Sequence, residues 1–398
     1  MTGRLLAPSL AACVLALAAF SQPSASRLVA VADIHGDLTA FTSILRAAGL
    51  TDHAGAWRGG RARFVQTGDY TDRGPDVRRI MDLLRSLERS ARSAGGRVDV
   101  LLGNHEVMNI LGIYRDVNPA VYASFADARS EARRERAYSD HRRLADRRAD
   151  QLQTRPPLYD VGDRDAWMAA RPLGFVEHAA ALGPGGDYGR WLRQKQVALD
   201  ADGTILMHAG IDPQSAPPSI DALNRTVRDE IRRYDRARKH LVDRGLILPF
   251  FTLNETIAAV TVEAEAIQAG RGSPVDALHI EMLQVVLDVG ESPLLAGDGP
   301  LWFRGFATWS DNEGGEHVAS LLSQYRAVRF IAGHSVQREV TSRFDHRIFL
   351  IDTGMLAAVY KGRASALEIA GGRISAIYPD GRALLQEGAA QRVGAAAR

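Results

Sequence analysis

Six short apolar segments, each ending at polar residues, are the feature that most constrains the fold of this 398-residue chain. The segments are four or five residues long and rich in β-branched and other apolar residues, which is typical of buried strands. Ligands of α/β proteins bind beyond the carboxyl ends of the strands, so the sequence predicts an α/β fold with one site at these ends. The segments span residues 28–32, 63–67, 98–102, 204–207, 328–332 and 347–351.

Five of the segments run into motifs of Asp, His, Asn and Gly. A lone motif of this size is more often a strand end whose polar residue is satisfied locally. The ordered set of five predicts a site for two closely spaced divalent metal ions. The motifs are Asp33-Ile34-His35-Gly36, Gly68-Asp69-Tyr70-Thr71-Asp72-Arg73-Gly74, Gly103-Asn104-His105-Glu106, His208-Ala209-Gly210 and Gly333-His334-Ser335.

Helical patterns lie between these motifs. Residues 38–48 and 76–91 have helical apolar spacing and follow strand–loop units, as crossover helices do. A longer helix is predicted around residues 227–241. Ser273-Pro274 is predicted to form the N-cap and first turn of a helix that ends near Gly290.

Two long intervals separate the motifs: His208 comes 103 positions after His105, and Arg304 comes 96 positions after His208. Both intervals are mainly helical in pattern, so we expect them to form a cap beside the site. Two short apolar segments, residues 366–369 and 374–378, flank Gly371-Gly372, and this pattern predicts a hairpin. The expected organisation is a catalytic domain over residues 27–385, helical insertions over roughly 110–200 and 215–295, and a flexible tail over 386–398.

Residues 1–26 predict a secretory signal peptide, because Arg4 precedes the apolar run 5–20 and a short polar segment follows. Cleavage before Arg27 would place the protein in the periplasm or outside the cell. It would also remove Cys13, the single cysteine, which excludes an intrachain disulfide. The alternatives are an uncleaved or lipid-modified N-terminus that anchors the protein in a membrane, and a misassigned start codon.

The charge of the chain is nearly balanced, with a net charge of +2, and gives no whole-chain reason to expect nucleic acid as a partner. The Arg-rich stretch 129–148 contains interspersed acidic residues, which predicts a solvated helix carrying ion pairs. The same stretch could help to recruit anionic substrates. The sequence does not predict the oligomeric state.

The residue types in the motifs divide into two ligand sets. Asp33 and His35 alternate across one turn and can point at one cation, and the carboxylate of Asp69 can bridge two cations. Asn104, His208 and His334 offer neutral oxygen and nitrogen donors to the second cation. Such a mixed set suits Mn, Fe or Zn better than Ca or Mg, and we expect Mn. Metal ions about 3.5–4 Å apart would share a water that becomes the attacking hydroxide.

Hydrolysis of a phosphate ester also requires a proton donor and a positive charge at the phosphoryl oxygens. His105 is the expected general acid, with Asp72 holding its other ring nitrogen, although Asp72 could instead cap a turn. Arg73 and Arg304 can bind the phosphate oxygens bidentately, although Arg304 could be an ordinary surface residue. Asp37 is expected to cap the following helix and not to bind metal.

These motifs resemble the phosphoprotein phosphatase branch of the calcineurin-like metallophosphoesterases. Residues 103–109 and 351–355 are most similar to its bacterial-type Shewanella-like phosphatases. The resemblance implies a four-layer α/β/β/α sandwich of two mixed sheets with a helical cap. It assigns the ligands Asp33, His35 and Asp69 to a first metal ion, Asp69, Asn104, His208 and His334 to a second, Arg73 and Arg304 to the phosphate, and His105 to the role of acid.

The sequence departs from the eukaryotic pattern at Ala32, Asp37, Ala209 and Ser335, without removing a ligand. We therefore expect metal-dependent hydrolysis of phosphomonoesters, with phosphorylated protein as the substrate and a small phosphoester as an open possibility. One alternative is a nucleotide or bis-nucleoside polyphosphate hydrolase. Another is a non-catalytic phosphate-binding module, which His105 and Asp72 argue against because binding alone needs no proton donor.

Overall fold

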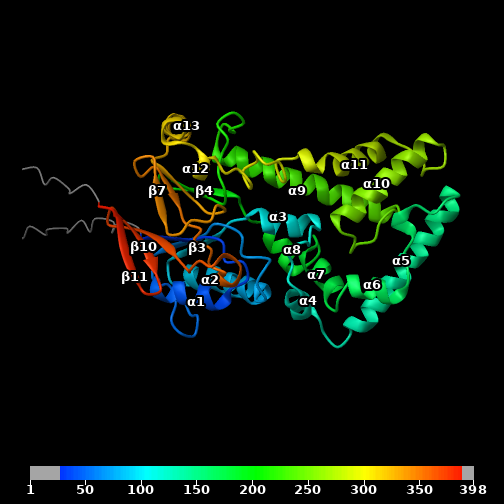
Figure 1. Ribbon diagram of the computed structural model, residues 1–398, viewed down its shortest axis with the longest axis horizontal. Coiled ribbons are helices and arrows are strands. Elements are labelled where there is room, and N and C mark those ends of the chain that lie inside the picture. Colours follow the sequence, from blue (N-terminus) through cyan, green and yellow to red (C-terminus); the bar gives the residue numbers. More distant parts are fainter. Residues whose placement is uncertain (1–26, 388–398) are drawn as a thin grey trace, which may run out of the picture.

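Two β-sheets pack face to face in the computed structural model, which describes residues 27–387 (Figure 1). Within these residues the first sheet has six strands in the order β11-β10-β9-β1-β2-β3, and the second has five in the order β4-β5-β6-β8-β7. Both sheets are mixed: the first is parallel from β1 to β3 and antiparallel from β1 to β11, and the second has parallel pairs at its centre and an antiparallel pair at each edge. The strands are β1 (Leu28–Val31), β2 (Arg63–Gln66), β3 (Arg97–Val100), β4 (Ala198–Ala201), β5 (Thr204–Met207), β6 (Arg329–Ala332), β7 (Thr341–Arg343), β8 (Ile348–Leu350), β9 (Ala366–Ala370), β10 (Arg373–Tyr378) and β11 (Gly381–Gln386).

The central strands are apolar throughout because both of their faces are covered. In β1, Leu28 and Ala30 belong to the cluster between the two sheets, whereas Val29 and Val31 pack beneath the outer helices. The two-residue period of a strand thus divides one apolar run between two layers of core. The cluster between the sheets also contains Val65, Leu101, Leu206, Ile331 and Phe349.

Helices cover the outer face of each sheet. On the first sheet lie α1 (Leu38–Ala47) and α2 (Val77–Ser93), and on the second lie α12 (Gly305–Thr308) and α13 (Asp311–Tyr325) (Figure 1). The side chain of Asp37 accepts a hydrogen bond of 2.8 Å from the amide of Ala40, so Asp37 caps α1 as expected. The predicted four-layer sandwich of two mixed sheets is confirmed.

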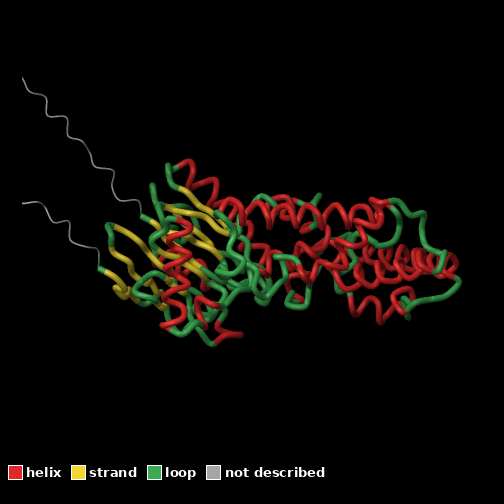
Figure 2. The backbone as a smooth tube through the Cα atoms, turned by 90° about the horizontal axis from the view of Figure 1, so that it is seen from above, coloured by secondary structure: helices red, strands yellow, loops and turns green. Residues whose placement is uncertain are grey.

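Most of the remaining helices form an elongated arm beside the sheets (Figures 1 and 2), whereas the short helix α14 (Ala357–Tyr360) follows β8 and places Tyr360 beside His35. Segments from the two long intervals pack against each other within the arm: the amide of Leu253 donates to the carbonyl of Gly112 at 3.0 Å, and buried Arg148 pairs with buried Glu263. The helices of the arm are α3 (Asn104–Leu111), α4 (Pro119–Phe125), α5 (Ser130–Leu152), η1 (Pro157–Tyr159), α6 (Arg164–Ala170), α7 (Phe175–Leu182), α8 (Asp187–Leu192), α9 (Ile220–Asp243), α10 (Leu253–Gln268), α11 (Ala277–Leu287) and η2 (Asp288–Glu291).

The Arg-rich stretch lies on α5, where its cations are paired with acidic residues. Ion pairs join Arg133 to Asp127 and Glu177, and Arg134 to Glu131. The expectation of a helix carrying ion pairs is confirmed.

One predicted helix start is wrong. Helix α11 begins at Ala277, and its N-cap is Asp276, whose carboxylate accepts a hydrogen bond of 2.7 Å from the amide of His279. Ser273-Pro274 lies in the preceding loop, where the amide of Ser273 donates to Glu263. The carboxylate of Asp276 accepts from the amide three residues further along the chain, which is the usual hydrogen bond of an N-cap.

The predicted signal peptide, residues 1–26, lies outside the described residues, as do residues 388–398 of the predicted tail. Among the helices of residues 27–387, none combines the length and the apolar character needed to cross a membrane.

Candidate dinuclear metal centre

The strand ends of both sheets bring the six predicted metal ligands together. Asp33 and His35 follow β1, Asp69 follows β2, and Asn104 opens α3 directly after β3. His208 follows β5 and His334 follows β6, so the second sheet supplies two ligands. All six side chains are buried, with His334 the most exposed at 7%.

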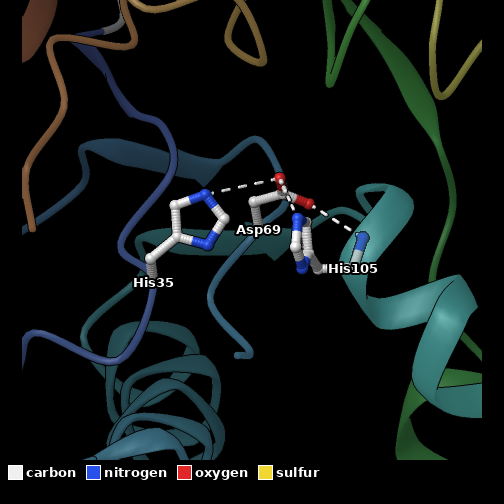
Figure 3. A group of neighbouring side chains, drawn as sticks. All are labelled: His35, Asp69 and His105. Atoms are coloured by element: carbon white, nitrogen blue, oxygen red, sulfur yellow. Dashed lines mark hydrogen bonds and ion pairs between the residues drawn. The ribbon is translucent and has the colours of Figure 1, made fainter. Parts of the chain in front are cut away.

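The carboxylate of Asp69 lies between His35 and His105 (Figure 3) and also approaches His208. Its Oδ2 lies 3.6 Å from Nε2 of His35 and 3.4 Å from Nε2 of His208. Asp33 Oδ2 lies 4.0 Å from Nε2 of His35. Two groups of possible ligands share Asp69: the first group is His35, Asp69 and His105, and the second is Asp69, His208 and His334, so this carboxylate can serve two cations.

The ligand atoms of His208, Asn104 and His334 lie closer together than those of Asp33, His35 and Asp69. Nε2 of His208 lies 2.8 Å from Oδ1 of Asn104 and 3.1 Å from Nδ1 of His334. Side chains that converge in this way present lone pairs to one small volume, which is the arrangement a cation stabilises.

Hydrogen bonds at the outer ring nitrogens orient two of the predicted ligand histidines, His35 and His334. His35 donates from Nδ1 to the carbonyl of Thr71 at 3.3 Å, so Nε2, which lies nearest Asp69, carries the lone pair. His334 donates from Nε2 to the carbonyl of Trp302 at 3.1 Å, which leaves the lone pair of Nδ1 toward His208. Backbone carbonyls commonly orient metal-binding imidazoles in this way, so these residues fit a metal site.

The electrostatics of the cluster also fit bound cations. Burial raises the pKa of Asp69 to about 7, and burial together with the charge of Asp352 raises the pKa of Asp33 well above its usual value. Burial lowers the pKa of His35 and His208, and lowers that of His334 to about 3, so these imidazoles are neutral. Two divalent ions would compensate the buried carboxylates and accept the imidazole lone pairs.

The backbone is unusual at these positions. Of the thirteen non-glycine residues with positive φ in the described part, six are predicted site residues: Asp33, His35, Asp69, Asp72, Arg73 and His334. Non-glycine residues seldom adopt this conformation, and it concentrates at functional sites.

Glycine is required where two loops approach the ligands. A Cβ at Gly103 would lie 2.2 Å from Oδ1 of Asp69 and 2.9 Å from Nδ1 of His208. A Cβ at Gly333 would lie 2.3 Å from Oδ1 of Asp33. Any side chain at either position would therefore displace a ligand.

His105 differs from the other histidines of the cluster. Its Nδ1 donates to Oδ2 of Asp72 at 2.9 Å, and its Nε2 lies 3.9 Å from Oδ2 of Asp69 (Figure 3). Burial lowers the pKa of His105, but the charge of Asp69 and the hydrogen bond to Asp72 outweigh burial, and the net shift is upward. Asp72 thus holds His105 and does not cap a turn.

Arg73 and Arg304, which are far apart in the sequence, each contact a predicted metal-ligand residue. Arg73 donates from Nη1 to Nε2 of His35 at 2.9 Å, and its guanidinium lies over the ring of Tyr360. Arg304 donates from Nη1 to the carbonyl of His334 at 3.0 Å and to the hydroxyl of Ser335 at 3.2 Å. Both arginines are therefore adjacent to ligand residues.

Sequence reasoning missed the role of Glu106. Its fully buried carboxylate accepts hydrogen bonds from the amides of Asp69, Tyr70, Thr71 and Gly103 and from the hydroxyl of Thr71, at distances of 2.7–3.0 Å. It thereby ties the loop after β2 to the start of α3. Membership of the Gly103–Glu106 motif was its only signal, because a glutamate in the first turn of a helix is common.

Asn109 was also missed as a part of the site, and Asp352 was considered as a lining residue but given no role. Asn109 donates from Nδ2 to Oδ1 of Asp72 at 2.8 Å and to the carbonyl of His105 at 2.9 Å. Asp352 is buried beside Asp33, and burial raises its pKa to about 6. Asn and Asp are also common at helix caps, so the residue type alone does not mark either residue as part of the site.

We expect Glu106→Gln to weaken metal binding. The amide NH₂ of glutamine faces backbone donors, so at least one buried N–H loses its acceptor, at a typical destabilisation of about 1–3 kcal/mol. Loss of such an orienting partner typically lowers metal affinity about 10–100-fold, which calorimetric titration with Mn²⁺ would measure. Glu281→Gln, on the exposed face of α11, is the control. Unchanged affinity in Glu106→Gln would show that the loop keeps its shape without this carboxylate.

Manganese should stabilise the protein more at pH about 7.5 than at pH about 5. The pKa of Asp69 is raised to about 7. In metal-free protein, the contribution of this carboxyl group to stability is therefore complete at low pH and is lost as the group ionises up to pH 7. Bound metal removes that loss, whereas at low pH it must displace a proton. Thermal unfolding with and without Mn²⁺ at the two pH values measures the difference. An equal shift at both values would contradict the burial of an uncompensated carboxylate.

Comparisons with known proteins agree with this geometry. The family model described as calcineurin-like phosphoesterase matches residues 26–231. An uncharacterized protein of Schizosaccharomyces pombe is 26% identical over 348 residues, which are 85% of this chain and 76% of that protein. Shewanella-like protein phosphatase 2 of Arabidopsis thaliana is 30% identical over 223 residues, which are 55% of this chain and 54% of that protein.

Among solved structures, the cold-active protein-tyrosine phosphatase of a psychrophilic Shewanella species superposes with a TM-score of 0.53 at 21% identity. The alignment covers 92% of this chain and 83% of that one, and shows the shared fold. Since the family model spans more than half of the chain, the protein belongs to the calcineurin-like phosphoesterases and is a metal-dependent hydrolase of the phosphatase type.

Proposed function

We propose that the protein hydrolyses phosphomonoesters on phosphorylated proteins. The observation that carries the proposal is the arrangement around Asp69. One carboxylate is shared by two groups of metal ligands, and the hydrogen-bonded pair of His105 and Asp72 stands beside it. A site for phosphate binding alone needs the cations and arginines but not a positioned proton donor.

The ligands suit two divalent ions, and we propose manganese because the donors mix carboxylate, amide and imidazole groups. Such ions, when bound, lower the pKa of water to supply the nucleophile and neutralise charge on the phosphoryl oxygens. Asp33, His35 and Asp69 would hold one ion, and Asp69, Asn104, His208 and His334 the other. His105 also lies within reach of the first group, but its raised pKa and its bond to Asp72 favour a proton donor over a ligand.

His105 would protonate the leaving oxygen from Nε2, because Nδ1 is committed to Asp72. Asp72 keeps the ring in this orientation and stabilises the protonated form. Asn109 in turn fixes the second oxygen of Asp72. Arg73 and Arg304 would bind the phosphoryl oxygens, and the guanidinium of Arg73 would exchange its contact with His35 for one with the substrate.

Phosphorylated protein is proposed as the substrate because two of the relatives carry protein phosphatase names. We also propose export, on the sequence of residues 1–26 alone, with membrane anchoring as the alternative. The N-terminal sequence of protein from fractionated cells tests this.

His105→Asn should lower turnover about 10²–10⁴-fold while two metal ions remain bound. Asparagine keeps a polar group in the pocket but cannot donate a proton at neutral pH. Turnover of p-nitrophenyl phosphate and metal content by elemental analysis are the two readouts, and His53→Asn, at an exposed position, is the control. A variant that retained wild-type turnover would remove His105 from the reaction, and one that lost metal would make it a ligand.

The substrate class is tested with metal-stripped protein to which Mn²⁺ is returned. We expect manganese-dependent release of phosphate from a mixed panel of phosphoserine, phosphothreonine and phosphotyrosine peptides, and from p-nitrophenyl phosphate. Hydrolysis of bis-nucleoside polyphosphates in preference to peptides would replace the proposed substrate with a nucleotide. Absence of turnover with any metal ion, despite measured metal binding, would contradict a catalytic function.

A further inference from the structure

A cavity of about 390 Å³ lies at the C-terminal end of α3. Its walls come from α3, α7 and α9, whose places in the fold Figure 1 shows, and none of the ten predicted site residues lines it. Ile110, Tyr114, Ala179 and Val242 make the walls largely apolar. The volume falls in the range of small-molecule sites.

The charged side chains of this cavity are mostly cationic. Arg193, Arg236, Arg238 and Lys239 line it, against a single acid, Asp235. Arg193 is fully engaged, since its guanidinium binds both oxygens of Asp235 at 2.7 and 2.9 Å. Lys239 is paired with Asp243 at 2.6 Å, outside the cavity lining.

Two of these cations have no carboxylate partner within residues 27–387. Arg238 is half-buried and donates to the carbonyls of Pro249 and Phe251, both at 3.0 Å, while the carboxylate of Asp235 nearby is engaged by Arg193. Arg236 is exposed and makes no ion pair or hydrogen bond with the described residues. An apolar cavity with uncompensated positive charge is complementary to a molecule with an apolar body and one negative group.

We propose that this cavity binds an amphipathic anion, an apolar molecule carrying one carboxylate. The apolar body would lie against Ile110, Tyr114 and Val242, and the carboxylate would lie toward Arg236 and Arg238. The proposal of binding does not depend on the proposed phosphatase function, because it rests on the lining residues alone.

Helix α3 connects this cavity to the candidate metal centre. Its first residues are Asn104 and His105, and its last turn provides Asn109 and Ile110 to the cavity wall. Asn109 is 2% exposed, its Nδ2 holds Asp72, and its Oδ1 has no hydrogen-bond partner in the described part of the chain. The same side chain therefore borders the cavity and supports the pair of His105 and Asp72.

The last turn of α3 is held by α9, so a molecule in the cavity between the two helices can shift α3. The hydroxyl of Tyr234 on α9 donates to the carbonyl of Leu111 at 2.8 Å. A molecule between α3 and α9 would press on a helix fixed at both ends. This step rests on the proposed function: binding of the anion in the cavity should change turnover without competition with the substrate.

Binding is tested on the full metal-loaded protein by calorimetric titration with decanoate, and with decanol as the uncharged molecule of equal chain length. We expect one decanoate per chain and weaker binding of decanol. Val242→Trp, which fills the cavity, should abolish binding of decanoate. Arg236→Ser should weaken decanoate about threefold, as exposed charge pairs do, whereas Arg225→Ser on the exposed part of α9 should not. Absence of saturable binding, or wild-type affinity in Val242→Trp, would overturn the proposal.

The link to turnover is tested separately with p-nitrophenyl phosphate. Saturating decanoate should change kcat with KM unaltered in the wild type and leave Val242→Trp unaffected. A competitive pattern that persists in Val242→Trp would place the anion at the metal centre and overturn the coupling, as would an unchanged kcat. If the protein showed no phosphatase activity, the titration would still decide whether the cavity binds the anion.

Discussion

The position of the Asp69 carboxylate is the constraint on which the rest of the site depends. Its Oδ1 accepts from the amide of His105 at 3.1 Å, and its Oδ2 faces His35 and His208. His35 comes from the first sheet and His208 from the second, so the two sheets must be in register at their carboxyl ends for one oxygen to meet both. The amide of Asp69 is in turn fixed by Glu106, which also holds the start of α3. One carboxylate thus unites both sheets, the first helix of the arm and both groups of ligands.

This arrangement destabilises the metal-free protein. Buried carboxylates lie close together, and non-glycine residues with positive φ typically destabilise a fold by about 1–3 kcal/mol each, least for Asp. The hydrogen bonds of Glu106 and the double-sheet core offset part of this loss. Bound cations would offset the remainder, because they would compensate the carboxylates that burial otherwise keeps protonated. Folding of the site and binding of metal are therefore linked.

The parts that sequence reasoning predicted share a simple physical cause. Strands β1, β2, β5, β6 and β8 are almost wholly buried, so each lies in a short apolar run, and Asp69 or His334 is noticeable because it follows such a run. The edge strand β3 was found because it leads into the apolar pair Leu101-Leu102, whereas the other edge strands, β4, β7 and β11, were missed because they are partly exposed and have no such run. Glu106 and Asn109 could not be assigned, since their roles depend on partners more than thirty positions away, in the loop after β2. The joining of two distant helical segments into one arm, through pairs such as Arg148 and Glu263, has no local signal either.

The most direct test of the account is the number of manganese ions bound per chain by the wild type and by Asp69→Asn, measured by calorimetric titration of metal-stripped protein. A shared carboxylate predicts two ions in the wild type and a loss of affinity at both positions in the variant, since one oxygen serves both groups of ligands. Retention of one position at wild-type affinity in Asp69→Asn, or a single ion in the wild type, would contradict a centre built around Asp69.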